Sequence, residues 1–525
     1  MPMPGSQANP TDSTGLAEQP SEDPEKQPVQ DVATGHEKFS VFTTGEKRAM
    51  VAIGSLAAFF SPLSSSIYFP ALDTIASALD VSTSKINITV TTYLILQGVA
   101  PMFIAGFSDT AGRRPAYMIC FTIYLAANLG LGLQNSYAAL LVLRMLQSAG
   151  SSGTVALANG LVADMVTSSE RGSYIAFASL GSMLGPSLAP VIGGLISQYL
   201  NWHWIFWFLL ILSGVFFTGL ALFLPETCRK VVGDGSIPPP TLNMSLTDVL
   251  RHKRRIKKGL NPDPEKVAEI RKNYRLRIPS PWPTLRVCFD LETALILLTT
   301  GLMFACFYAV MTGATTSFHE VYHFNNIQTG LMYLPIGAGG IVSAFTTGRI
   351  VDWNYRRHAK KAGLPVLKNV RADIRNFNIE KVRIQVALPL YYTSLVTVIG
   401  YGWVLGHKVN LAAPIILLFI CGYCLNGASQ VLNALMVDIW PGRSASATAA
   451  NNLFRCELGA AASAAISPMT QAMSSGWAYT TLALIALAAS PSFWIMMTHG
   501  IKWRQKRLGK KEESEAQKNG VNIKI

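Results

Sequence analysis

Twelve apolar blocks, each about as long as a bilayer-spanning helix, limit what this chain can fold into. A helix needs about 20 apolar residues to cross the hydrocarbon core of a membrane. Of the 525 residues, 50% are hydrophobic and 14% are charged, whereas a soluble chain typically carries about 25% charged residues. The sequence therefore predicts a polytopic membrane protein. The predicted spans are residues 50–70, 86–106, 116–134, 138–162, 172–198, 203–224, 291–313, 327–350, 384–405, 411–438, 445–470 and 477–498.

The order of these blocks predicts two halves of six helices each. Lipid cannot satisfy open backbone groups, so each span must be helical, and the predicted fold class is an all-α membrane protein. The first residues are rich in Pro, Ser, Glu, Gln and Asp and lack an apolar core, which predicts disorder. The predicted divisions are a disordered cytosolic tail (1–46), an N-terminal bundle (47–225), a basic cytosolic loop (226–290), a C-terminal bundle (291–500) and a basic cytosolic tail (501–525).

The positions of the basic residues predict the orientation of the chain. The formal net charge is +14. With the N-terminus inside, the cytosolic loops hold most of the Lys and Arg residues, and the outer loops hold almost only Lys85 and Lys408. This distribution follows the positive-inside rule, so we expect both termini in the cytosol. No nucleic-acid-binding module accompanies the basic charge, and we expect no nucleic-acid partner.

A charge pattern recurs after the second helix of each half. Asp109 is followed four residues later by Arg113, and Asp352 is followed four residues later by Arg356. Two similar six-helix halves joined by a long loop predict two bundles that move around a shared central cavity.

The first of these loops resembles the signature between the second and third helices of the major facilitator superfamily. The matching residues are Asp109, Gly112, Arg113 and Arg114, and Ala105 stands where the signature opens with Gly. A carboxylate beside two guanidiniums can form charge-assisted bonds in one conformation and lose them in another. The resemblance implies this role in conformational change, and the alternative is a role in topology alone.

The fourth span carries a second resemblance, to the Arg-x-x-Gln-Gly signature of proton-coupled facilitators. Arg144 and Gln147 match it, and Ser148 replaces the Gly. Arg144, Gln147, Ser151 and Thr154 share one helix face. An Arg inside a span is costly and is expected to face a cavity or a partner. The resemblance ties Arg144 to proton coupling or substrate binding, and the alternative is a buried structural arginine.

The fifth span resembles the antiporter signature, in which small residues recur at every fourth position before Pro and Gly-Gly. The matching residues are Gly185, Pro186, Pro190, Gly193 and Gly194, with an alanine in place of the Gly before the second Pro. Small residues allow close helix contact and Pro bends the helix. In the family this motif marks exporters, and the alternative is ordinary packing.

The eleventh span supplies further candidates for the central cavity. Asn451, Asn452 and Arg455 share a face about ten residues into the helix, which is near mid-bilayer. We hypothesise that Arg144 and Arg455 line the cavity and favour anionic or acceptor-rich substrates. Glu457 is the best-placed carboxylate for a proton, although it points away from Arg455 around the helix, and a structural ion pair is the alternative.

Four more segments narrow the resemblance to fungal twelve-span drug:proton antiporters, among them quinidine-resistance-type pumps and fungal citrate exporters. These segments are residues 61–73, 169–172, 224–227 and 444–456, and the resemblance covers residues 45–500. It implies the major facilitator fold and proton-coupled export of small organic molecules such as drugs, toxins or secondary metabolites. It also implies a plasma-membrane location, a monomer, and no cofactor beyond the proton gradient. Export of organic acids such as citrate or itaconate, and a membrane sensor without transport, remain open.

Two other observations bear on enzymatic activity. The sequence from His319 to His323 matches the zinc-protease pattern, but it lies beside a short outer loop with no third ligand, so we expect no metal site. No Walker sequence is present, so ATP is not expected as a direct energy source. The sequence therefore predicts a transporter rather than an enzyme.

Overall fold

A computed structural model describes residues 40–166, 171–240, 243–257, 267–268, 280–361, 377–440 and 444–518 of the chain. Residues 1–39 of the predicted disordered tail and residues 258–266 and 269–279 of the predicted basic loop lie outside the described residues. Within them the regular structure is helical, with no strand.

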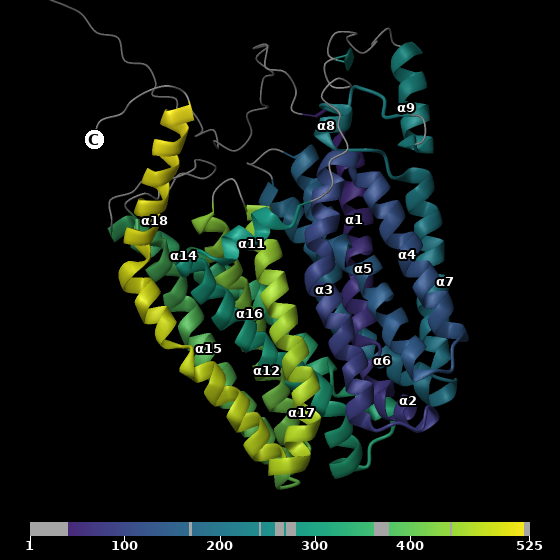
Figure 1. The fold of residues 1–525 in the computed structure, drawn as a ribbon, viewed down its shortest axis with the longest axis vertical. Coiled ribbons are helices and arrows are strands. Elements are labelled where there is room, and N and C mark those ends of the chain that lie inside the picture. The colour runs from purple at the N-terminus through teal and green to yellow at the C-terminus, as the bar shows by residue number, and fades with distance from the viewer. Residues whose placement is uncertain are drawn as a thin grey trace, which may run out of the picture. The chain divides into compact units, whose positions relative to one another are not determined.

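The N-terminal half contains six long helices and the short elements that follow the first of them (Figure 1). Figure 1 shows α9 beyond one end of α7. The elements are α1 (Thr44–Ser66), η1 (Phe69–Ala71), α2 (Leu72–Ala78), α3 (Thr83–Ala111), α4 (Arg113–Leu133), α5 (Tyr137–Met165), α6 (Arg171–Tyr199) and α7 (His203–Phe223), followed by α8 (Arg229–Val232), α9 (Leu246–Lys257) and α11 (Trp282–Cys288) between the halves.

The C-terminal half repeats the six-helix plan with one long helix that folds back on itself. Ser474 has φ 72° inside α17, so the chain reverses there and α17 contributes two antiparallel arms. The elements are α12 (Leu291–Tyr322), α13 (Asn326–Leu331), α14 (Leu334–Lys361), α15 (Ile379–Gly406), α16 (Ala412–Ile439), α17 (Ser444–Ala488) and α18 (Pro491–Lys518).

Hydropathy alone identifies ten helical segments of the described chain as candidate membrane spans. One of them, Ser446–Arg507, includes the reversal at Ser474 and therefore crosses twice. The helix α5 is not among the ten because Arg144 and several hydroxyl and amide side chains lower its hydropathy. With α5 and the second crossing, the structure has the twelve spans that the sequence predicts, and it confirms the all-α fold class.

Among the described residues, the side-chain hydrogen bonds between the two halves are confined to one side of the membrane. We call the side on which α1 begins and α18 ends the terminal side, and the opposite side the far side. Between described residues, every side-chain hydrogen bond that joins the halves lies between the middle of the bundle and the far side. These pairs are Ser84 with Ser467, Thr91 with Ala460, Gln97 with Asn452, Phe69 with Thr315, Gln198 with Asn326 and Thr74 with Asn326.

On the terminal side, α18 is fixed to the C-terminal half by buried charges. Arg504 is 2% exposed and forms an ion pair of 3.1 Å with Glu380, which is fully buried. Arg504 also donates to the carbonyl oxygen of Phe377 at 2.6 Å. One turn further on, Arg507 pairs with Glu292 and with Asp290. These contacts hold the part of α18 that lies beyond the spanning region against α12 and α15.

Replacing Arg504 with Ala should destabilise the protein by about 3 kcal/mol, because removing one partner of a buried ion pair leaves Glu380 without its counter-charge. Thermal unfolding of the purified protein in detergent measures this loss. Lys506→Ala is the matched control, since it removes an exposed cation from the same helix. Equal unfolding temperatures for the two variants would contradict the assignment.

Candidate functional site

Arg144 lies between two tyrosine rings in the middle of the N-terminal half. The centre of its guanidinium is 4.2 Å from the ring centroid of Tyr68 and 4.3 Å from that of Tyr93. Its side chain is completely buried. Aromatic faces attract a cation through their quadrupole, and the attraction is stronger away from water. The two rings therefore stabilise a charge that would otherwise be very costly inside the membrane.

The hydrogen bonds of Arg144 leave part of its donor capacity unused. Its Nη1 atom donates to Gln147 Oε1 at 2.6 Å and to the carbonyl oxygen of Ser64 at 3.2 Å. Gln147 in turn donates to Asn128 at 2.7 Å, which fixes the amide orientation. The Nε and Nη2 atoms of Arg144 are buried without a hydrogen-bond acceptor. No carboxylate of the described residues forms an ion pair with Arg144.

A chain of polar contacts runs from Arg144 to the C-terminal half. Tyr93, whose ring lies against the Arg144 guanidinium, donates from its hydroxyl to the carbonyl oxygen of Ser61 at 3.1 Å. Gln97 donates to the Ser61 hydroxyl at 3.2 Å, and the Gln97 carbonyl oxygen accepts from Asn452 at 2.9 Å. The sequence predicted an intramembrane role for Arg144 and Asn452 separately, and the structure joins them in one network.

Arg455 completes this network on α17. Its Nη2 atom donates to Asn452 Oδ1 at 2.7 Å, and its guanidinium lies 4.9 Å from the ring centroid of Phe304. Its Nε atom is buried without an acceptor. Neighbouring Asn451 donates weakly to Asn433 at 3.4 Å and keeps a buried carbonyl oxygen without a donor. The predicted face of α17 is therefore polar and incompletely hydrogen-bonded.

The two arginines differ in exposure in this conformation. Arg144 is 0% exposed, so it lines no open chamber, whereas Arg455 is partly exposed. In this conformation Arg144 and Arg455 therefore do not line one open cavity, although both arginines belong to the same polar network. Chemically, the network offers unused N–H donors of two guanidiniums within an apolar surround. Such donors bind carboxylate, phosphate or carbonyl oxygens strongly.

The turn between α3 and α4 is built around Glu226. The sequence alone did not indicate a role for this residue. Its carboxylate accepts from the backbone N–H groups of Arg113 at 2.9 Å and Arg114 at 3.2 Å, the first two residues of α4. A negative charge at a helix N-terminus is favourable. Gly112 has φ 117°, and a Cβ atom there would collide with the Glu226 carboxylate. Gly112 is therefore required both by the backbone conformation and by this contact.

Asp109 and Arg113 of the same turn form a charge cluster within the N-terminal half. Arg113 pairs with Asp109 at 2.6 Å and with Asp164 at 2.8 Å. Arg114 donates to the carbonyl oxygen of Ala221 at 2.7 Å. Among the described residues, none of these partners belongs to the C-terminal half.

Cys228 lies beside this charge cluster and outside the spans. Its backbone N–H donates to Glu226 at 2.9 Å. Burial raises the pKa of the Cys228 thiol to about 11, so the thiol stays neutral at physiological pH. It therefore adds no negative charge next to the Glu226 carboxylate.

The second copy of the charge pattern behaves differently. Asp352 and Arg356 are both exposed near the end of α14, and they form no ion pair with one another. The terminal side of this half instead contains an ion pair of 3.0 Å between Arg383 of α15 and Asp438 of α16. The sequence repeat is therefore not repeated in the contacts.

The glycines of α6 provide close contact with α1. A Cβ atom on Gly185 would lie 2.8 Å from Pro62 Cγ, and one on Gly193 would collide with the carbonyl oxygen of Ile67. These positions admit no side chain while the two helices stay at this distance. The glycines of this motif therefore allow α6 to pack closely against α1.

The opposite edge of the same motif meets the C-terminal half. A Cβ atom on Gly194 would lie 2.5 Å from the carbonyl oxygen of Asn326, and one on Gly330 would lie 2.5 Å from that of Pro190. Both Pro186 and Pro190 lie inside the helix α6. The motif therefore takes part in the contact between halves on the far side, which its sequence did not reveal.

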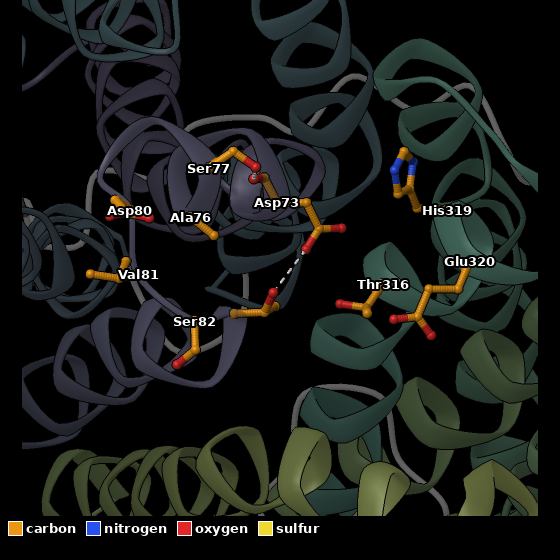
Figure 2. A pocket seen from close by; sticks show the side chains of 10 residues that line it. Asp73, Ala76, Ser77, Asp80, Val81, Ser82, Thr316, His319 and Glu320 are labelled. Atoms are coloured by element: carbon orange, nitrogen blue, oxygen red, sulfur yellow. Dashed lines mark hydrogen bonds between the residues drawn. The ribbon is translucent and has the colours of Figure 1, made fainter.

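A cavity of about 490 Å³ opens between the halves on the far side. Figure 2 shows Asp73 and Ser77 on the wall formed by α2, and Thr316, His319 and Glu320 facing them from α12. The described residues contain no group of three metal-binding side chains, and His319 Nδ1 contacts the carbonyl oxygen of Phe324 at 2.9 Å. The described side chains of His319, Glu320 and His323 are thus not gathered around one point.

Comparison with known proteins agrees with this architecture. The family model of the Major Facilitator Superfamily matches residues 54–464. An MFS-type transporter, phiD, of a fungal species is 55% identical over 487 residues, which cover 93% of this chain and 73% of that protein. Citrate exporter 1 of Aspergillus niger is 33% identical over 512 residues, which cover 96% of this chain and 95% of that protein.

A solved structure supports the same fold. The partially occluded inward open xylose transporter XylE of E. coli superposes with a TM-score of 0.59 at 12% identity, and the match covers 86% of this chain and 98% of that one. The helical bundle, its intramembrane polar network and these relatives lead to one conclusion: the chain belongs to the Major Facilitator Superfamily and is a multi-pass membrane transporter of the fungal type.

Proposed function

We propose that this transporter exports small organic molecules, such as drugs, toxins or secondary metabolites, in exchange for protons. The observation that carries the proposal is the state of Arg144, a buried guanidinium that pairs with no carboxylate of the described residues and leaves two nitrogen donors, Nε and Nη2, unused. Polar groups of this kind are retained inside membranes where transport uses them. A substrate oxygen that reaches Nε or Nη2 would supply the missing acceptor.

Export rather than import is supported by the resemblance of the α6 motif to the antiporter signature and by the name of one relative, a citrate exporter. The proton gradient is proposed as the energy source because the sequence lacks an ATP-binding signature. The basic charge on the terminal side supports a cytosolic location of both termini. We place the protein in the plasma membrane as a monomer that needs no cofactor.

Organic-acid export is the second candidate, and one specific observation favours it. The network contains two guanidiniums, Arg144 and Arg455, whose unused donors suit carboxylates. A relative that is 33% identical along nearly its whole length is named a citrate exporter. An acid such as citrate or itaconate would thus fit the same site.

Deleting the gene and comparing the culture medium by untargeted mass spectrometry tests export. At least one small organic compound should fall by tenfold or more outside the cell and accumulate inside. The identity of that compound separates metabolite export from organic-acid export. The purified protein in liposomes should then move it only when a pH gradient is imposed. Binding of the compound without any flux would instead indicate a sensor.

Arg144→Lys should lower transport about tenfold, because an ammonium keeps the charge but loses the planar stack between Tyr68 and Tyr93, a difference on the order of 1.4 kcal/mol. Initial rates in liposomes at equal protein content measure the effect. Lys506→Ala should retain the wild-type rate. An unchanged rate for Arg144→Lys would remove Arg144 from the substrate path.

A further inference from the structure

The helices α3 and α17 form a continuous contact between the two halves, which we call the seam. On the far side, the hydroxyls of Ser84 and Ser467 lie 3.2 Å apart. Further in, Thr91 donates to the carbonyl oxygen of Ala460 at 3.3 Å. The last hydrogen bond, from Asn452 to the carbonyl oxygen of Gln97, lies near the middle of α3. The described residues show no hydrogen bond between the two helices beyond it toward the terminal side.

Glu457 lies at this inner end of the seam, against a glycine. A Cβ atom on Gly98 would lie 3.0 Å from Glu457 Oε1, 3.1 Å from Cys456 Cβ and 3.3 Å from the carbonyl oxygen of Leu453. The absence of a side chain at Gly98 is what allows the carboxyl group to lie between the helices. Its Oε1 atom is buried and has no hydrogen-bond donor, while the residue as a whole is half-buried.

Among the described residues, no guanidinium or ammonium group pairs with Glu457 in the seam. On the facing stretch of α3, residues 93–108, the one ionisable side chain is Tyr93, whose hydroxyl donates to the carbonyl oxygen of Ser61. On α17 the neighbouring groups are the thiol of Cys456 and the guanidinium of Arg455, which is bonded to Asn452 instead. From α12, the ionisable Tyr308 packs against the next turn of α17. Between described residues, Glu457 forms no ion pair.

An ionised carboxylate and a neutral carboxylic acid place different demands on this site. A charged oxygen that is withdrawn from water without a donor costs several kcal/mol, whereas a proton on the carboxyl group removes the charge and most of that cost. When the seam parts, water also reaches the buried Oε1 atom and solvates the charge. The protonation of Glu457 and the closure of the seam are therefore thermodynamically linked.

We propose that Glu457 binds the coupling proton and that this proton stabilises the closed seam. The proposal rests on the proton coupling of the proposed function and assigns its site. With the seam parted, Glu457 takes a proton from the far side. The neutral side chain then fits between α3 and α17, the far side closes, and the proton leaves toward the terminal side.

The same linkage explains how a proton gradient would drive export. After the proton has left toward the terminal side, the ionised Glu457 destabilises the closed seam. Substrate binds from the terminal side, and the loaded transporter then reopens to the far side, where substrate is released and the next proton binds. A carboxyl group located at the contact between the halves converts proton binding directly into a change of conformational equilibrium.

Spin labels on exposed far-side residues of the two halves measure seam opening without any substrate. Labels at Asn135 and Lys408, in a background with the seven native cysteines replaced, report one distance distribution by electron–electron double resonance. Raising the pH from 4.5 to 8.5 should shift the wild-type population at least fivefold toward longer distances. Glu457→Gln, which mimics the neutral acid, should keep the short distance throughout.

The cavity of Figure 2 provides the control, because it also holds carboxylates between the halves. Glu320→Gln should keep the wild-type pH response. The proposal is overturned if Glu457→Gln retains that response, or if the wild type shows none. A third outcome is a pH response of the label distances that depends on Glu457, together with no proton-driven flux in liposomes. In that case the proposed proton coupling of transport fails, while Glu457 remains the group whose protonation closes the seam.

A second variant tests the seam without altering an ionisable group. Gly98→Ala introduces a methyl group 3.0 Å from Glu457 Oε1, so it should shift the labels toward the longer distance at every pH. Gly400→Ala is the matched control, because a Cβ atom there meets Leu417 at an ordinary 3.6 Å. A distance distribution for Gly98→Ala that equals the control would show that Gly98 is not part of the closing contact.

Discussion

The burial of the Arg144 guanidinium, which pairs with no carboxylate in the described part of the chain, is the constraint on which the rest of the candidate site depends. A cation in the membrane interior requires compensation, and here it comes from two tyrosine faces and two oxygen acceptors. The tyrosines come from α3 and from the segment after α1, so those elements must pack closely around α5. The resulting core is buried, yet it leaves donors unused, and such donors suit an oxygen-rich molecule.

Close backbone contact is the second requirement, and glycine meets it in different ways. Glycines on two edges of α6 allow this helix to pack closely against α1 on one edge and against the C-terminal half on the other. On α3, the missing side chain of Gly98 leaves room for the Glu457 carboxyl group. Contacts that depend on a missing side chain form at one separation only. They are therefore suited to a junction that is either closed or parted.

The two halves share a helical plan but not a charge network. In the N-terminal half, Asp109, Arg113 and Glu226 organise the turn between α3 and α4. In the C-terminal half, the corresponding Asp352 remains exposed, and the buried ion pair of Arg504 with Glu380 fixes the terminal side instead. The difference follows from α18, which extends past the membrane and brings its arginines against α12 and α15. On the terminal side of the N-terminal half, the short helix α9 supplies Arg251, which forms an ion pair of 2.7 Å with Glu46 of α1.

The sequence by itself determined the twelve spans, the two halves and the intramembrane position of Arg144 and Arg455, because lipid enforces helices and polar residues within apolar blocks stand out. It also indicated Glu457, as the best-placed carboxylate. Only the tertiary structure decided what these residues meet: the tyrosine pair around Arg144, the path through Ser61 and Gln97, the cap formed by Glu226, and the absence of a pair between Asp352 and Arg356. Spacing along a helix fixes which side chains share a face, but the neighbour across that face comes from a segment tens or hundreds of residues away, and its position depends on the packing of all the helices together.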